Sequence, residues 1–107
     1  MMNLLEKAYN EQRVLHITYH AKYEEPLIAE RDIEVYKYDN IYISAYCRLL
    51  KGMRNFRIDR ITDIELIDEY FEIDHNILEQ VDEEGWAGKS EEWVKNKIKE
   101  LFWHGYN

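Results

Sequence analysis

Residues 41–61 have the sequence IYISAYCRLLKGMRNFRIDRI, which predicts the hairpin at the centre of the fold. In IYISAYC, aliphatic side chains alternate with polar or tyrosine side chains, which is typical of a strand with one buried face. LKGM contains a glycine and suits a hairpin loop, and RNFRID is predicted as the next strand. A loop over 50–53 pairs Cys47 with Phe56 and keeps the apolar side chains of both strands on one face.

This register gathers tyrosines and arginines on the outer face of the hairpin. The predicted cross-strand pairs are Tyr46 with Arg57, Arg48 with Asn55, and Ser44 with Asp59. Arg54 and Arg60 fall in phase with the core at the ends of the second strand, where long side chains can reach the rim of the sheet. The candidate ligand-binding residues are Tyr42, Ser44, Tyr46, Arg48, Arg54, Arg57 and Arg60.

The candidate residues combine two kinds of chemistry. Guanidinium groups bind phosphate through a bidentate fork, and tyrosine rings offer faces on which a base can stack. The set therefore suits a nucleotide, an oligonucleotide end or another planar anion. The same alternation is also common on solvated sheet faces, where Arg57 can simply pair with Asp59, Glu65 or an acid from the C-terminal part of the chain.

Charge is unevenly distributed along the 107 residues, whose formal net charge is −8. Residues 1–61 contain 10 basic and 9 acidic residues, whereas residues 62–107 contain 4 and 13. This balance argues against non-specific binding to duplex nucleic acid but allows one local anion site. The acidic stretch over 63–92 is predicted to be solvated; the alternative is that it occupies the arginine surface intramolecularly.

The rest of the chain predicts helices on either side of the strands. A short amphipathic helix is expected from Asn3, as its N-cap, to about Gln12, and a last helix is expected after Ser90. Further strands are predicted over 13–19, 29–36 and 63–68, with a loop over 21–26 that contains the only proline. The predicted fold is mainly β, a small antiparallel barrel of about five strands with N-terminal and C-terminal α-helices.

The hairpin also carries a family resemblance. RDIEV at 31–35, IYI at 41–43, AYCR at 45–48 and RNFRIDRI at 54–61 are similar to the pattern of the WYL domain family, named for a Trp-Tyr-Leu triplet. The resemblance covers about residues 3–73. Three positions depart from it, because Ile41 replaces the tryptophan, Ile43 the leucine and Val35 a proline. A ligand contact made through that tryptophan ring would be missing here.

The resemblance implies an SH3/Sm-like barrel with an N-terminal helix over residues 1–73, followed over 74–107 by an acidic linker and an amphipathic helix packed on the same domain. Members of the family are mostly bacterial transcription regulators in which this domain follows a winged helix-turn-helix and senses nucleic-acid or nucleotide ligands. Carried over by residue, the ligand surface falls on Tyr42, Ser44, Tyr46, Arg54, Arg57 and Arg60. Because Arg13 already enters the first strand, we expect a sensor module alone, with a separate DNA-binding regulator as a possible partner.

Two functions compete on these grounds. One is a regulatory module that binds a nucleotide or single-stranded nucleic acid, and the other is a structural oligomerisation or protein-interaction module without a small ligand. The apolar side of the last helix, with Trp93, Phe102 and Trp103, packs on its own barrel or binds a partner chain. We predict a homodimer stabilised partly by this helix.

Other chemical signals are weak, and no enzyme activity, metal or cofactor is expected. His16 and His20 would lie about 13 Å apart on a strand, too far for one metal ion. Cys47 falls on the inner face as a small hydrophobe, and a lone cysteine fits a reducing compartment. No apolar run approaches the ~20 residues of a membrane helix and no signal-peptide core is present, so a cytoplasmic location without membrane contact is expected.

Overall fold

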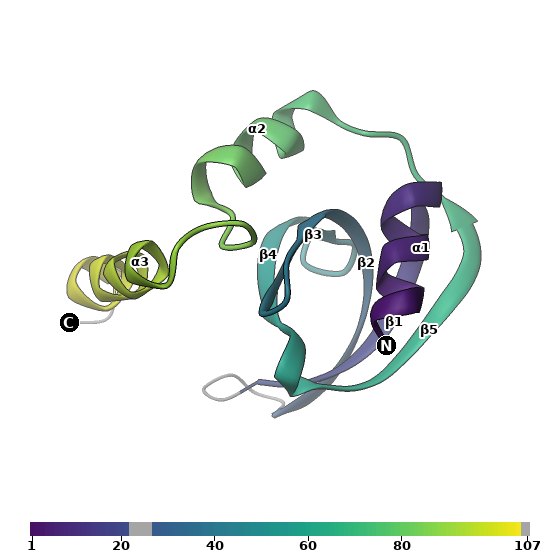
Figure 1. The fold of residues 1–107 in the computed structure, drawn as a ribbon, viewed down its shortest axis with the longest axis horizontal. Helices are drawn as coiled ribbons and strands as arrows, with labels where there is room; N and C mark the ends of the chain where they lie inside the picture. The colour runs from purple at the N-terminus through teal and green to yellow at the C-terminus, as the bar shows by residue number, and fades with distance from the viewer. Residues whose placement is uncertain (22–26, 106–107) are drawn as a thin grey trace.

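The computed structural model describes residues 1–21 and 27–105, with side chains up to Leu101. Figure 1 shows a curved sheet with one helix at its N-terminal side and two helices that follow the last strand. The order of elements is α1 (Met2–Glu11), β1 (Arg13–His20), β2 (Ile28–Tyr38), β3 (Tyr42–Cys47), β4 (Gly52–Arg57), the 3-10 turn η1 (Ile58–Arg60), β5 (Ile61–Tyr70), α2 (His75–Glu84) and α3 (Glu91–Gly105). The five predicted strands and both predicted helices are confirmed, and α2 is an addition; residues 22–26 of the predicted loop lie outside the described residues.

The five strands form one antiparallel sheet in the order β4-β3-β2-β1-β5, which is not closed into a barrel. The predicted antiparallel arrangement of five strands is confirmed, but the predicted SH3/Sm-like barrel is wrong. β4 passes through η1 directly into β5, which pairs with β1. The edges of β4 and β5 share no backbone ladder in the described part of the chain. The curl of the sheet still brings the end of β4 close to β1, since the backbone N–H of Arg57 donates to the Tyr19 hydroxyl at 3.1 Å.

The main hydrophobic core lies between the inner face of the sheet and α1. Leu5 and Ala8 of α1 are fully buried against Ile17, Ile33 and Ile43. The helix forms because its apolar side chains recur at helical spacing. The expected Asn3 cap is wrong: α1 begins at Met2, and the carbonyl of Met1 accepts its first backbone hydrogen bonds.

A second core lies on the opposite face of the sheet, beneath α2. Val14, Tyr36 and Met53 of the sheet are buried together with Phe71 and Val81. The predicted acidic linker is therefore wrong over α2, which docks on the sheet. The sequence feature that marks the start of α2 is its N-cap, Asp74, whose carboxylate accepts the backbone N–H of Asn76 at 2.8 Å. The apolar side chains that line the docked side of α2 are Ile77, Leu78 and Val81.

The register of the central hairpin differs from the predicted one by four residues. Cys47 pairs with Gly52, and Ile43 pairs with Phe56, so β4 begins two residues earlier than the predicted strand. A shift by an even number of residues leaves the same side chains on the same faces, which is why the alternation alone could not detect it. The shift moves Arg57 away from Tyr46 and places it opposite Tyr42.

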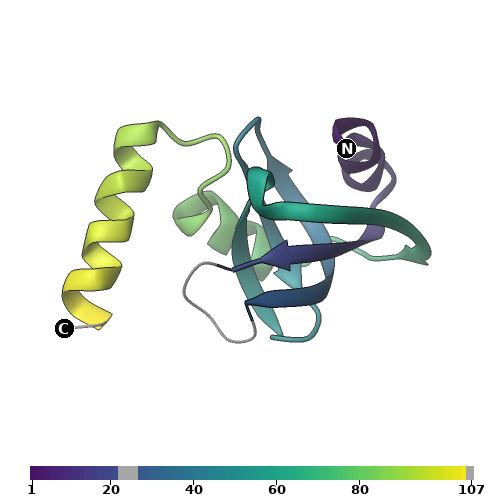
Figure 2. The same cartoon turned by 90° about the horizontal axis from the view of Figure 1, so that it is seen from below.

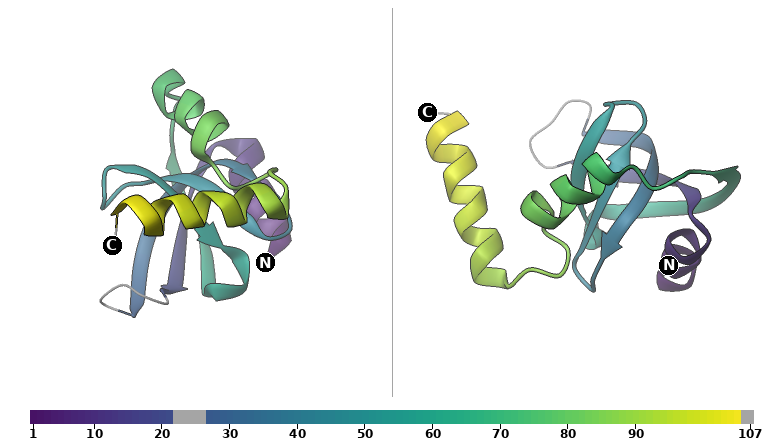
Figure 3. Two further views of the ribbon diagram at one scale, coloured as in Figure 1. Left: turned by 90° about the vertical axis from the view of Figure 1, so that its left-hand side faces the viewer. Right: turned by 90° about the horizontal axis from the view of Figure 1, so that it is seen from above.

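The last helix begins where the sequence predicts, because the Ser90 hydroxyl accepts the backbone N–H of Trp93 at 3.1 Å. Figures 2 and 3 show α3 standing apart from the sheet. Val94 near its start is buried, whereas Leu101 is 51% exposed. The predicted packing of the whole apolar side on the sheet is thus absent among the described side chains. None of the helices that the structure describes combines the length and apolarity needed to span a membrane.

Candidate functional site

The seven predicted ligand-binding residues do not form one surface, because some of them are buried or already paired and others are exposed. Ser44 is fully buried, and its hydroxyl donates to Asn55 Oδ1 at 2.8 Å and accepts the backbone N–H of Ala87 at 3.1 Å. Tyr46 is half-buried in the second core beneath α2. The prediction that Ser44 lies on an exposed face opposite Asp59 is wrong, because α2 and the segment after it cover the middle of β3.

Arg48 lies at the opposite end of β3 from Tyr42, about 20 Å away at the rise of an extended strand. Its guanidinium donates to Glu34 at 2.9 Å and also pairs with Glu69. Burial lowers the pKa of Arg48, but the hydrogen bonds to Glu34 and Glu69 outweigh it and raise that pKa overall. Arg48 therefore links β2, β3 and β5 as a structural contact, already neutralised by two carboxylates.

Tyr42 and Arg57 form a cross-strand pair at the other end of the hairpin. The Arg57 side chain is 48% exposed and donates to Asp59 at 2.9 Å, a bond that raises the pKa of the guanidinium. Such an exposed pair contributes little free energy, so a phosphate can replace the carboxylate. Arg60 lies about 6 Å further along the 3-10 turn and forms no ion pair with any described residue. We call Tyr42, Arg57 and Arg60 the Tyr42–Arg57 site.

Arg54 does not join the Tyr42–Arg57 site. It lies opposite Ala45 on β4, whereas Arg57 lies opposite Tyr42 at the end of the same strand. Residues at even and odd positions of a strand point to opposite faces of the sheet, so the side chains of Arg54 and Arg57 lie on opposite faces. Arg54 is exposed and donates to the carbonyl of Met53 at 2.8 Å. Of the four predicted arginines, Arg57 therefore lies opposite the tyrosine and Arg60 follows it in η1.

Trp86 reaches the site from the segment after α2, a contact that the sequence analysis missed. Its ring meets that of Tyr42 edge to face, with centroids 5.3 Å apart and planes at 85°. The segment is fixed by three successive backbone N–H groups that donate to side chains of the sheet region. These bonds are Trp86 to Asn55 Oδ1 at 2.9 Å, Ala87 to Ser44 Oγ at 3.1 Å and Gly88 to Asp39 Oδ2 at 2.7 Å.

Asp39 anchors both partners of this contact. Besides the Gly88 N–H, its carboxylate accepts the backbone N–H groups of Ile41 at 2.8 Å and Tyr42 at 2.7 Å. Burial raises the pKa of Asp39, but these backbone hydrogen bonds outweigh it and lower the pKa overall. The ionised carboxylate therefore holds the start of β3 and the segment carrying Trp86 in one arrangement.

The acidic stretch over 63–92 is partly solvated and partly packed over the face that was predicted to bind ligand. Its acidic side chains on α2 are exposed, as predicted: Glu79, Asp82, Glu83 and Glu84. Its backbone and apolar side chains nevertheless cover Ser44 and Tyr46, so the prediction that it leaves this face open is wrong there. Within the described residues, Glu69 with Arg48 is its one ion pair to an arginine.

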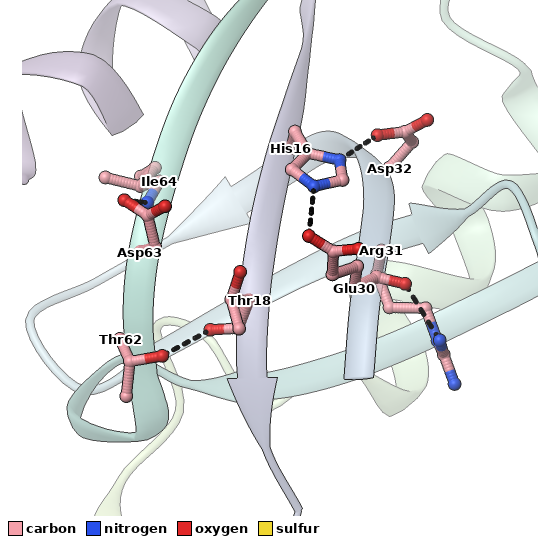
Figure 4. Close-up of polar contacts among 8 residues, drawn as sticks. All are labelled: His16, Thr18, Glu30, Arg31, Asp32, Thr62, Asp63 and Ile64. Atoms are coloured by element: carbon pink, nitrogen blue, oxygen red, sulfur yellow. Dashed lines mark hydrogen bonds and ion pairs between the residues drawn. The ribbon is translucent and has the colours of Figure 1, made fainter. Parts of the chain in front are cut away.

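A second polar group joins β1 and β2, where β1 runs between β2 and β5 (Figure 4). His16 Nδ1 lies 2.6 Å from Asp32 Oδ1, and its Nε2 lies 3.4 Å from Glu30 Oε1. The hydrogen bond that His16 donates to Asp32 raises the pKa of His16 above its ordinary value of 6.5; burial opposes this, and Glu30 adds to it. Protonated His16 therefore stabilises the β1–β2 pair.

This geometry predicts a pH-dependent contribution to stability. Because the folded pKa of His16 exceeds 6.5, its contribution is complete below that pH and is lost as pH rises through the folded pKa. We expect Asp32→Asn to flatten this decline, by less than about 1 kcal/mol since the pair is partly exposed. Urea unfolding of both proteins over a pH series from about 5 to 8 measures it. Parallel pH profiles would contradict the assignment.

Comparisons with known proteins agree with this architecture. The family model of the WYL domain matches residues 1–66. Among solved structures, the proteasome accessory factor B/C (PafBC) of Arthrobacter aurescens is similar, with 26% identity and a TM-score of 0.52. The match covers 64% of this chain and 11% of that one, so the chain corresponds to a small part of PafBC. No curated protein sequence matches the chain. The family match ends within β5, so α2, Trp86 and α3 lie beyond it.

Proposed function

Because the chain belongs to the WYL domain family, whose members are ligand-sensing regulatory modules and not catalysts, we propose that it senses a nucleotide or the end of a single-stranded nucleic acid. The Tyr42–Arg57 site binds this ligand. The observation that carries the proposal is the pairing of Tyr42 with the half-exposed Arg57 across β3 and β4. This pairing puts an aromatic ring beside an exchangeable cation.

The chemistry of the site favours a phosphate-bearing ligand. The Arg57 guanidinium uses only Nε towards Asp59, and it exchanges that carboxylate for a phosphate, which carries more charge and can accept two parallel hydrogen bonds. Arg60 supplies a second cation from η1. Of the other predicted residues, Ser44 is enclosed and Arg48 is already paired, so neither contacts the ligand; Tyr46 and Arg54 lie outside the site.

We expect the double substitution Arg57→Ala, Arg60→Ala to weaken binding of a short oligodeoxyadenylate by at least about tenfold at low salt. Two cations that meet phosphates are lost, so the slope of log affinity against log salt should also become shallower, by about 0.7 for each phosphate contact removed. Fluorescence anisotropy of a labelled oligonucleotide across a salt series measures both quantities.

The matched control is Arg31→Ala, which removes an arginine of β2 whose guanidinium donates to the backbone carbonyl of Glu30 at 2.8 Å. It lowers the net charge without touching the Tyr42–Arg57 site. Because the control removes one positive charge and the double variant removes two, a loss of log affinity in the control half as large as that in the double variant would show that overall charge alone attracts the oligonucleotide. Unchanged binding in the double variant would place the site elsewhere.

The partners predicted from the sequence stay predictions. α3 extends from the body with Leu101 half-exposed, which supports the predicted homodimer and, with it, the alternative of an oligomerisation module. A separate DNA-binding regulator would receive the ligand signal, as the family resemblance implies.

A further inference from the structure

Trp86 adds a second aromatic ring to the Tyr42–Arg57 site. Its indole is half-buried, and its contact with Tyr42 leaves the two rings nearly perpendicular, at 85°. The position at which the WYL triplet has its tryptophan holds Ile41, an aliphatic side chain that is 47% exposed. The indole next to Tyr42 therefore comes from a segment beyond the residues that the family model matches.

The position of Trp86 is built into the fold. Its own backbone N–H and those of Ala87 and Gly88 all donate to buried or half-buried side chains from β2 to β4. The preceding residue, Gly85, is buried, and a Cβ atom there would lie 2.9 Å from Ser44 Oγ. A ring held this firmly loses little conformational freedom when a ligand binds, which is the property of a preorganised contact.

We propose that Trp86 is a base-contacting residue, so that the ligand of the Tyr42–Arg57 site carries an unpaired base next to its phosphate. This inference rests on the proposed function and narrows it. Arg57 and Arg60 bind the phosphate, while the indole and the Tyr42 ring contact the planar base. Stacking on aromatic rings tolerates any base, because every base has a π-face.

The experiment compares two ligands on three proteins. The ligands are a labelled oligodeoxyadenylate and an abasic strand of the same length, which keeps the phosphates and lacks the bases. The proteins are the full chain, Trp86→Leu and the control Trp93→Leu, which removes a tryptophan of α3 whose ring is contacted by Lys89 and Lys97. Trp86→Leu should bind the oligodeoxyadenylate about tenfold more weakly, equivalent to about 1.4 kcal/mol, and the abasic strand unchanged.

Trp86→Phe separates a lost base contact from a disturbed fold. It keeps an aromatic face and should retain most of the affinity for the oligodeoxyadenylate. In the full chain, the oligodeoxyadenylate should also quench tryptophan emission more strongly than the abasic strand, and this difference should disappear in Trp86→Phe. The quenching comparison decides the question if Trp86→Leu is poorly folded.

The outcomes separate this inference from the proposed function. Two results would overturn the role of Trp86. The first is that Trp86→Leu loses affinity for both strands equally and both strands quench the tryptophan emission of the full chain equally. The second is that Trp86→Leu keeps its affinity for the oligodeoxyadenylate. If the arginine variant still loses both ligands, the proposed function survives that result. Failure of the full chain to bind either strand overturns both proposals. Equal affinity of the full chain for the two strands overturns the base contact alone.

Discussion

Replacing Ile43 with alanine is expected to lower the free energy of unfolding by about 2–5 kcal/mol. Ile43 is fully buried at the centre of the main core, where β3 pairs it with Tyr38 of β2 and Phe56 of β4. Removing its outer carbons leaves a cavity that a sheet pinned on both sides cannot collapse to fill. Urea unfolding followed by circular dichroism gives the change.

The matched control is Ile41→Ala, two residues earlier. Ile41 is 47% exposed just before β3 begins, so its loss should change the free energy of unfolding by less than about 0.5 kcal/mol. The two variants make the same substitution at the two isoleucines of the IYI triplet, so a difference between them reports the difference in burial. Similar effects of both substitutions would mean that Ile43 is not buried in the main core as observed.

Gly85→Ala is expected to destabilise the protein by about 1–3 kcal/mol, the cost of forcing an extra carbon into a packed site. A Cβ atom at residue 85 would lie 2.4 Å from the backbone carbonyl oxygen of Val81 and 2.9 Å from Ser44 Oγ. Its φ of −68° is open to any residue, so the constraint is space and not backbone conformation. The end of α2 must move away from β3, which strains the Ala87–Ser44 hydrogen bond.

Gly52→Ala provides the comparison for this substitution. The added Cβ atom would lie 3.0 Å from Nη1 of Arg54, the far end of a flexible side chain that can shift at little cost. Thermal and urea unfolding should therefore show a clear loss for Gly85→Ala and almost none for Gly52→Ala. If the two variants are equally stable, the close docking of α2 on Ser44 is not present in solution.

Some of the candidate site could be predicted from the sequence because it follows from local chemistry. Alternation in IYISAYC places the side chains of Tyr42 and Ile43 on opposite faces of the sheet whatever the register. The order of the arginines in RNFRIDRI is given by the sequence itself. The pairing of these residues could not be predicted in the same way. A hairpin loop of the same length placed two residues earlier in the chain satisfies the alternation equally well, and only the packing of Ile43 on Phe56 selects it.

Helix α2 shows a different limit. Its charged residues outnumber its apolar ones, so the segment resembles a solvated linker until its docking surface is known. The outer face of the sheet supplies that surface, with Tyr36 and Met53 buried beneath α2. A short amphipathic helix gains most of its stability from such packing, and the partner surface is distant in sequence. The position of Trp86 follows from the same docking.

The sequence by itself determined the strands, the first and last helices, the family and the concentration of arginines between residues 48 and 60, because periodicity and residue order are local properties. The tertiary structure decided which of those arginines can meet a ligand. Arg48 is neutralised because the sheet brings Glu34 and Glu69 to it, whereas Arg57 remains half-exposed beside Tyr42. It also left the sheet open, because β5 pairs with β1 and leaves β4 as an edge. Charge pairing and edge pairing depend on distances between residues far apart in the chain, which composition and spacing do not specify.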